Sequence, residues 1–266
     1  MSQMSEDQKL NIFADILDSS KYVVFHGGAG VSTESGIPDF RSKNGLYHRK
    51  NKKFSAYKPE YLLSYDCLKH KPEIFFDYYR NNLDARAVDP NPAHFKLAEM
   101  EERGQLVGVV TQNIDGLHQK AGSKNVQEIH GTIWRNYCVS CGAEYDENYI
   151  FDSKEKIPVC EKCGKMVRPN DIRTPPASGS LLMSNDVTLY GEFLPEEAYQ
   201  NAINMMNSAD CLIIGGTSLE VGSASQLAHL FHGDHLIIIN KGKTKLEGRA
   251  ELVFHDSIGK VLSALF

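Results

Sequence analysis

The sequence predicts an α/β protein built on a doubly wound parallel sheet that carries a smaller second lobe. The first observation behind this prediction is a set of short apolar runs, of the kind that a parallel sheet buries on both faces. These runs span residues 22–25, 106–111, 211–214 and 236–239. The second observation is that helical patterns lie between the runs, for example over residues 92–103 and 195–207. Strands that alternate with helices in this way are expected to form a sheet covered by helices.

Length and composition agree with this class. The chain has 266 residues, which is long for one domain and short for two. Its 29 lysines and arginines against 34 aspartates and glutamates give a formal charge of −5, which disfavours a protein that coats nucleic acid. No apolar run approaches the roughly 20 residues of a membrane span, and the polar start lacks the apolar core of a signal peptide. We therefore expect a soluble, cytoplasmic protein with no membrane or direct nucleic-acid partner.

The first predicted helix spans residues 7–20, where apolar side chains recur at helical spacing. The strand-like run at residues 22–25 follows it and stops at a glycine-rich segment. A buried strand that breaks into glycines is typical of the entrance to a nucleotide-binding βα unit.

That segment, residues 28–33, begins like the G-x-G-x-x-G motif, but Thr33 holds the sixth position. No acidic residue follows at the usual distance, so a hydride-transferring dehydrogenase is disfavoured. Backbone N–H groups at a glycine turn and a helix N-terminus still suit a pyrophosphate. The alternative is a tight turn with a purely structural role.

Residues 35–41 combine a turn, a proline, an aromatic ring and an Asp39/Arg41 pair. Phe40 could cover a planar ring, and Arg41 could meet a phosphate. A surface turn with a buried phenylalanine is the other interpretation.

Polar side chains follow the run at 106–111, where Gln112, Asn113 and Asp115 stand at a strand end. Ligands of open α/β sheets bind there, and such side chains suit sugar hydroxyls and an amide. The alternative is a capping turn. His130 follows the short run at 126–129 and is placed to accept a proton near neutral pH, or else is a hydrogen-bonded structural histidine.

The later strands end in the same way. Residues 215–218 close the run at 211–214, and Asn240 and Lys241 close the run at 236–239. Both loops are candidates for ribose and adenine contacts.

Two stretches, residues 41–84 and 135–184, leave the alternation and look like insertions that form the smaller lobe. The second contains two CxxC pairs, formed by Cys138, Cys141, Cys160 and Cys163. Two such pairs suit one tetrahedral Zn²⁺, and four sulfur ligands leave no open position for chemistry, so the metal is expected to be structural. Two disulfides are the alternative that a cytosolic compartment disfavours, and a nucleic-acid-binding ribbon is the alternative that the acidic balance disfavours.

These motifs resemble the sirtuin family in their residues and in their order along the chain. They lie at residues 28–41, 111–115 and 130–131, at the CxxC pairs, and at residues 190–192 and 216–218. The resemblance implies a discontinuous Rossmann-like NAD-binding lobe made of residues 1–40, 85–134 and 186–266. It also implies a small lobe with a helical module at 41–84 and a zinc module at 135–185.

The resemblance implies an NAD-dependent protein lysine deacetylase that acts on acetyl-lysine proteins or peptides. In this family the acyl oxygen attacks C1′ of the nicotinamide ribose and nicotinamide leaves. A histidine base then activates a ribose hydroxyl, and water completes the release of free lysine and O-acetyl-ADP-ribose. NAD is the implied co-substrate, and one structural Zn²⁺ is the implied metal.

Matching the motifs assigns the base to His130, the positioning of ribose and water to Asn113, and the nicotinamide carboxamide to Asp115 with Ile114. Phe40 is implied to shield the C1′ face. The full cofactor set implied by the resemblance is Gly28, Ala29, Gly30, Thr33, Asp39, Phe40, Arg41, Gln112, Asn113, Ile114, Asp115, His130, Gly216, Thr217, Ser218, Asn240 and Lys241.

Two departures from the family pattern affect specificity. Relatives that prefer succinyl or malonyl groups carry Tyr-x-x-Arg on the helix lining the acyl pocket, and here Phe76 and Tyr79 fall at those positions. Arg80 comes one residue late, about 100° around the helix, so we expect a neutral acyl group, acetyl first. Residues 170–185 are an apparent insert rich in Pro, Ser and Gly, expected to be a loop that modulates the peptide groove, or else an inert loop or a sequence artefact.

Two other functions use the same residues. A mono-ADP-ribosyltransferase would share the C1′ chemistry. An NAD or ADP-ribose binding module weakened by the insert would bind without turnover, which the presence of His130, Asn113 and Asp115 argues against.

Overall fold

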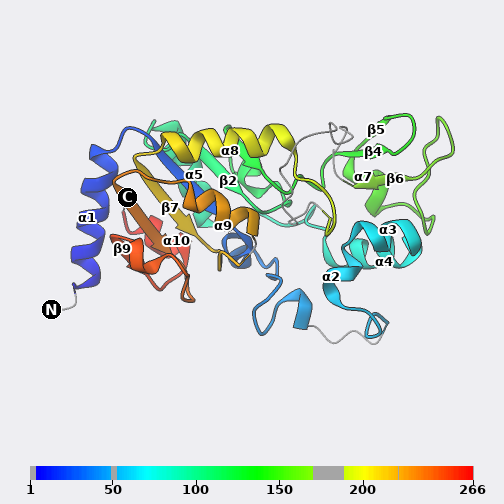
Figure 1. Cartoon of the computed structure of the whole chain (residues 1–266), viewed down its shortest axis with the longest axis horizontal. Helices are drawn as coiled ribbons and strands as arrows, with labels where there is room; N and C mark the ends of the chain where they lie inside the picture. Colours follow the sequence, from blue (N-terminus) through cyan, green and yellow to red (C-terminus); the bar gives the residue numbers. More distant parts are fainter. Residues whose placement is uncertain (1–3, 49–52, 170–188, 221, 266) are drawn as a thin grey trace.

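The computed structural model describes residues 4–48, 53–169, 189–220 and 222–265 of the chain. A large sheet with its helices occupies one end of the elongated molecule, and a small lobe occupies the other (Figure 1). Both described ends of the chain lie at the large-sheet end. The segment expected to be an insert, residues 170–185, lies outside the described residues.

The large sheet has six parallel strands in the order β3-β2-β1-β7-β8-β9. They are β1 (Val23–Gly27), β2 (Gly108–Thr111), β3 (Val126–Glu128), β7 (Cys211–Gly215), β8 (His235–Ile239) and β9 (Leu252–Phe254). The order runs outward in both directions from β1 and β7, which is the doubly wound arrangement and confirms the predicted fold class. Such a sheet binds ligands outside the carboxyl ends of the strands where the order reverses.

Helices cover both faces of the large sheet. They are α1 (Glu6–Ser19), α5 (Pro92–Glu102), α6 (Leu117–Lys120), α8 (Glu196–Ser208), α9 (Gly222–His229) and α10 (Ile258–Ser263), with short 3-10 turns η1 (Ala29–Ser35) and η3 (Glu247–Arg249). Successive strand residues enter opposite cores: Phe25 packs with α1, α5 and α10, whereas Val24 packs with α8 and α9. Burial on both faces is why these strands read as continuous apolar runs.

Local signals fix where two of these helices begin. The Ser5 hydroxyl accepts from the Gln8 N–H, and the Gln8 side chain accepts from the Ser5 N–H, which is a capping box for α1. Asn91 caps α5 by accepting from Ala93, and Pro92 opens that helix. Each cap satisfies backbone donors that the first turn of a helix cannot pair itself.

The small lobe joins a helical module to an antiparallel sheet. Its helices are η2 (Leu46–His48), α2 (Pro59–Leu62), α3 (Tyr65–His70), α4 (Pro72–Asn82) and α7 (Glu147–Phe151), and its strands are β4 (Asn136–Cys138), β5 (Glu144–Tyr145) and β6 (Val167–Pro169) in the order β5-β4-β6. One apolar core unites the two parts, with Phe75 and Phe76 of α4 packed in the same cluster as Ile150 and Val167. Within the described residues, no helix has the length and apolar character that a membrane crossing requires.

Sequence patterns located the long elements better than the short ones. The helix expected over 7–20 is α1, and the strand-like runs became β1, β2, β3, β7 and β8. No sequence pattern identified α9, α10 or β9. β9 is only three residues long, too short for a distinct periodic signal.

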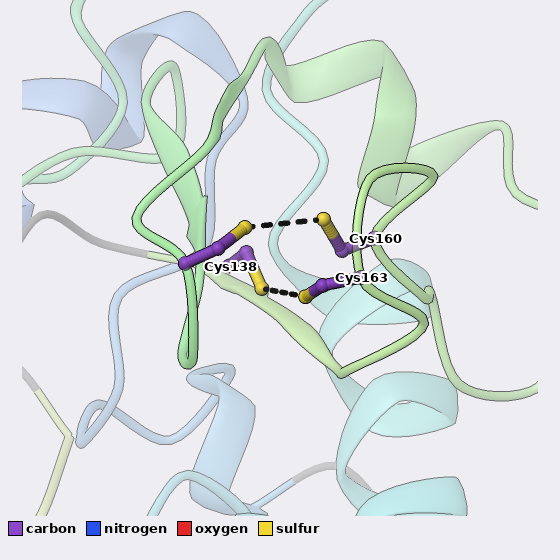
Figure 2. Close-up of side chains that lie close together, drawn as sticks. Cys138, Cys160 and Cys163 are labelled. Carbon is purple, nitrogen blue, oxygen red and sulfur yellow. Dashed lines mark hydrogen bonds between the residues drawn. The ribbon is translucent and has the colours of Figure 1, made fainter.

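The four cysteines of the CxxC pairs face one another in the small lobe (Figure 2). All four Sγ atoms lie within 4.8 Å of one another, with 3.4 Å between Cys138 and Cys163 and 3.5 Å between Cys141 and Cys160. The alternative of two disulfides is wrong, because a disulfide holds its sulfurs about 2.05 Å apart. A tetrahedral zinc with Zn–S bonds of about 2.3 Å spaces its ligands by roughly 3.8 Å, so these residues fit one Zn²⁺.

Three histidines are buried in the large lobe without full hydrogen bonding. Both ring nitrogens of His26 and His118, and Nε2 of His94, have no hydrogen-bond partner among the described residues. Burial lowers the pKa of His26 to about 4, that of His94 to about 4 and that of His118 to about 3. The rings of His94 and His118 lie edge to face with centroids 4.8 Å apart. A positive charge on His94 therefore disfavours a second positive charge on His118.

Removal of zinc is expected to unfold the small lobe. We predict one zinc per chain, and a fall of roughly 10 °C or more in the thermal midpoint after chelation, because structural zinc contributes directly to folding. Cys163→Ser should lose the metal and the stability together. Elemental analysis and thermal unfolding measure both effects. Cys67→Ser, which changes a cysteine outside the cluster, should keep one zinc per chain; full stability of the zinc-free protein would contradict this assignment.

Acid is expected to destabilise the large lobe through its buried histidines, at a pH above the range in which carboxylates become protonated. The unfolded chain protonates its histidines below about pH 6.5, whereas the folded chain keeps these three neutral, so the free energy of unfolding is full above that pH and falls as the pH drops towards 4. Each histidine should remove about 2 kcal/mol at pH 5. Urea unfolding at pH 7 and pH 5 measures the loss. His118→Phe should reduce the pH dependence, and His232→Phe, at an exposed histidine, should leave it unchanged; an equal slope in both variants would refute the assignment.

Candidate active site

A cavity of about 1070 Å³ opens at the carboxyl ends of β1, β2, β7 and β8 and extends to the small lobe. On the sheet side it is lined by the loops that follow these strands. On the other side it is lined by Leu63, Tyr79 and Tyr190 of the small lobe. Every residue of the cofactor set implied by the sequence lines this cavity except Gly28. The structure therefore brings together residues that are spread from Ala29 to Lys241 in the chain.

The loops after β1 and β7 meet backbone to backbone. The Gly28 N–H donates to the Gly215 carbonyl at 3.2 Å, and the Gly30 N–H donates to the Gly216 carbonyl at 2.8 Å. A Cβ on Gly30 would lie 2.6 Å from the Cα of Gly216, and Gly216 itself has a φ of +62°, so side chains are excluded at both positions.

This contact changes the role that the sequence suggested for the glycines. The glycine turn at residues 28–33 was expected to offer backbone N–H groups to a pyrophosphate. The Gly28 and Gly30 amides already donate to carbonyls at the end of β7 and in the loop after it, so neither amide is available to a pyrophosphate. The sequence could not show this, because nothing in the motif reveals which loop lies opposite.

A buried polar network forms part of the cavity floor. The Ser32 hydroxyl donates to Asp115 Oδ2 at 2.6 Å and accepts from Asn113 Nδ2 at 3.0 Å. The Leu117 N–H donates to Asp115 Oδ1 at 3.0 Å, and the Trp134 indole donates to the Asp115 carbonyl at 2.8 Å. Asn113 and Asp115 are therefore held in fixed orientations before any ligand binds. Ser32 was not assigned a role from the sequence, although it lies inside the first glycine motif.

Two buried acids of this region differ in their surroundings. Burial raises the pKa of Asp115, while the Ser32 and Leu117 hydrogen bonds act in the opposite direction. Burial raises the pKa of Glu128 to about 7, although Arg135 and hydrogen bonds from Gln119 and Thr132 lower it. Asp115 lines the cavity and Glu128 does not. Asp115 is thus the acid placed to meet a ligand.

His130 lies at the same sheet edge, directly after β3. Its Nδ1 is 2.9 Å from the carbonyl oxygen of Gln112, and because a carbonyl can only accept, Nδ1 carries the proton. Nε2 then holds a lone pair. The Ser223 hydroxyl lies 3.5 Å from Nε2, a distance at which any hydrogen bond between them is weak. His130 is half-buried and lines the cavity, so it is oriented as a proton acceptor.

The loops after β7 and β8 form the far end of the cavity. Thr217 Oγ1 accepts from the Gln112 side chain at 3.0 Å and from the Leu219 N–H at 3.1 Å. The Asn240 side-chain amide donates to the Gly242 carbonyl at 2.8 Å. Ser257 also lines this end of the cavity.

The end of the cavity at the small lobe has no cation from α4. Tyr79 lines the cavity, whereas Phe76 is fully buried in the lobe core. The Arg80 guanidinium points away, donating to the Ile150 carbonyl at 2.8 Å and to the Lys156 carbonyl at 3.4 Å. Among the described residues that line the cavity, the only lysine and arginine are Lys241 and Arg41.

Comparison with known proteins identifies the family. The model of the Sir2 family matches residues 28–223. A protein named NAD-dependent protein deacetylase from Clostridium acetobutylicum is 49% identical over 257 residues, covering 97% of this chain and 98% of its own. A protein of the same name from Clostridium perfringens is 48% identical, covering 96% of this chain and 98% of its own.

Solved structures agree. A Sir2 protein with a deacetylated p53 peptide and 3′-O-acetyl ADP ribose superposes with a TM-score of 0.82 at 33% identity, covering 96% of each chain. A Sir2 complex with a p53 peptide and NAD⁺ superposes with a TM-score of 0.80 at 32% identity, again covering 96% of each chain. With a family match over most of its length and relatives of nearly half-identical sequence, the chain belongs to the Sir2 family.

Proposed function

We propose that this chain is an NAD-dependent protein lysine deacetylase, which uses NAD to remove acetyl groups from lysine side chains of proteins or peptides. Its relatives carry the name NAD-dependent protein deacetylase at up to 49% identity, and similar Sir2 structures hold acetylated or deacetylated peptides. The reaction releases nicotinamide and free lysine and forms O-acetyl-ADP-ribose. We also propose a cytoplasmic location, which suits the unoxidised state of the cysteine cluster.

The observation that carries the proposal is the orientation of His130. Its Nδ1–H is fixed by the Gln112 carbonyl, so Nε2 presents a lone pair at the cavity wall. A general base must be deprotonated and within reach of the proton it removes. We assign to His130 the removal of a proton from a ribose hydroxyl, which makes that oxygen a nucleophile.

The site suits NAD by its shape and by its polar groups. Gly30 and Gly216 line the cavity and add no side chain to its wall. NAD, when bound, supplies an electrophilic ribose carbon, C1′, and nicotinamide as a leaving group. We assign Asn113 to the ribose and Asp115 to the nicotinamide carboxamide, because the Ser32 network fixes both side chains at the cavity floor.

Phe40 and Arg41 belong to the segment that closes one side of the cavity. We assign Phe40 to the exclusion of water from C1′, since an aromatic ring there would protect a developing positive charge from hydrolysis. Arg41 is placed for the diphosphate. Its ion pair with Glu220 spans 3.9 Å between exposed groups, which is weak enough for an anionic ligand to displace.

Replacement of the base should abolish catalysis and spare the fold. For His130→Ala we expect kcat for peptide deacetylation to fall about 10²- to 10⁴-fold, the usual contribution of a general base. The assay follows nicotinamide release and deacetylated peptide by mass spectrometry, and thermal unfolding checks the fold.

His232→Ala changes an exposed histidine away from the cavity and is the matched control. Label transferred from NAD to protein would instead indicate an ADP-ribosyltransferase. NAD binding without any turnover by the wild-type chain would contradict the proposed deacetylase.

The acyl preference is expected to be for a neutral group. Because Arg80 is bonded to the zinc-module side and does not line the cavity, we predict a kcat/KM for acetyl-lysine peptide at least about ten-fold above that for the succinyl peptide. Kinetics on one peptide carrying each acyl group measure the ratio. Arg80→Met should lower stability but leave this ratio unchanged; a collapse of succinyl activity in that variant would show that Arg80 reaches the acyl group.

A further inference from the structure

Two tyrosines from distant parts of the chain meet at the cavity wall. Tyr47 ends the segment that carries Phe40 and Arg41, and Tyr190 lies in the small lobe. Their phenol oxygens are 2.5 Å apart, so one hydroxyl donates to the other, and both residues line the cavity. The assigned chemistry uses neither hydroxyl.

Tyr190 is anchored firmly to the small lobe. Its N–H donates to the Leu63 carbonyl at 3.0 Å, and its carbonyl accepts from the Tyr65 N–H at 3.0 Å. Two residues later, Glu192 forms a bidentate ion pair with the buried Arg168 of β6, at 2.5 and 2.7 Å. The Tyr190 side chain therefore projects from a segment held by both the helical module and the antiparallel sheet.

Tyr47 is coupled directly to Phe40. The Tyr47 N–H donates to the Phe40 carbonyl at 2.9 Å, and the Leu46 N–H donates to the Asp39 carbonyl at 2.7 Å, so the two ends of this segment are paired. The Tyr47 and Phe40 rings meet edge to face with centroids 5.5 Å apart. The Arg41 guanidinium lies 6.0 Å from the centroid of the Tyr47 ring. Whatever fixes Tyr47 also fixes Phe40 and Arg41.

The hydroxyl pair of Tyr47 and Tyr190 is uncharged, which suits a contact that holds Phe40 and Arg41 in place. Burial and the contact with Tyr190 raise the pKa of Tyr47, so its hydroxyl stays protonated throughout the working range of pH. A neutral hydrogen bond of this kind holds geometry without adding charge beside the reacting centre.

We propose that Tyr47 and Tyr190 are positioning residues, whose hydroxyl pair holds Phe40 and Arg41 against the cofactor by tying the end of their segment to the anchored Tyr190. This inference rests on the proposed function for the identity of the cofactor as NAD. Loss of either hydroxyl would leave its partner unpaired and free the segment. NAD would then bind less tightly, and water would reach C1′ more often.

The test compares Tyr190→Phe, Tyr47→Phe and the double variant with the wild-type chain. We expect each single variant to weaken NAD binding, measured by calorimetry, by about three- to ten-fold, the usual effect of one lost hydrogen bond. The KM for NAD should rise by a similar factor while kcat changes little. The ratio of nicotinamide released to lysine freed should rise above that of the wild type. The double variant should be no worse than either single one, because the two hydroxyls act as one unit.

Tyr57→Phe is the matched control, because it removes a small-lobe hydroxyl that bonds Lys71 and does not line the cavity. Wild-type NAD affinity in Tyr190→Phe would overturn the proposal. Additive losses in the double variant, or a lower thermal midpoint with no change in NAD affinity, would show a structural role only and would also overturn it. The calorimetric measurement needs no turnover, so failure of the wild type to deacetylate would refute the proposed function separately.

Discussion

The contact between the backbones of Gly30 and Gly216 is the constraint on which the site depends. It joins the loops after β1 and β7, the two strands at which the order of the sheet reverses. Loops at such a point leave towards opposite faces and open a crevice between them. The loop after β1 also carries Ser32, which bonds both Asn113 and Asp115 in the loop after β2. The loop after β1 therefore contacts the loops of both neighbouring strands, and its residues form part of the cavity floor.

The site combines polar side chains that the large lobe holds in place with a wall that the small lobe forms. His130, Asn113 and Asp115 are oriented by bonds within the large lobe, to Gln112, Ser32 and Leu117. Phe40 and Arg41, by contrast, lie in a segment that ends at Tyr47, whose hydroxyl bonds that of Tyr190. His130 is thus oriented by contacts within the large lobe, whereas the placement of Phe40 and Arg41 depends on the contact between Tyr47 and Tyr190.

Patterns carried by neighbouring residues could be predicted from the sequence, and contacts between distant residues could not. The buried strands, the four cysteines and the turning of Arg80 away from the acyl end all follow from local spacing. The polar strand ends were found because parallel strands finish at one edge. The loss of the Gly28 and Gly30 amides to the β7 loop, the bonding role of Ser32 and the Tyr47–Tyr190 pair were missed, because each depends on which loop lies opposite. The resemblance to a known family supplied the residue roles, which spacing alone left open.

The ion pair between Arg168 and Glu192 has a consequence for the connection between these two residues. The two residues flank the segment 170–188, and their buried bidentate contact closes the connection at its base. The two ends of the connection are therefore held at fixed points by contacts that do not involve residues 170–188. Replacing those residues by a shorter or longer stretch should accordingly leave the Arg168–Glu192 contact and the anchoring of Tyr190 in place.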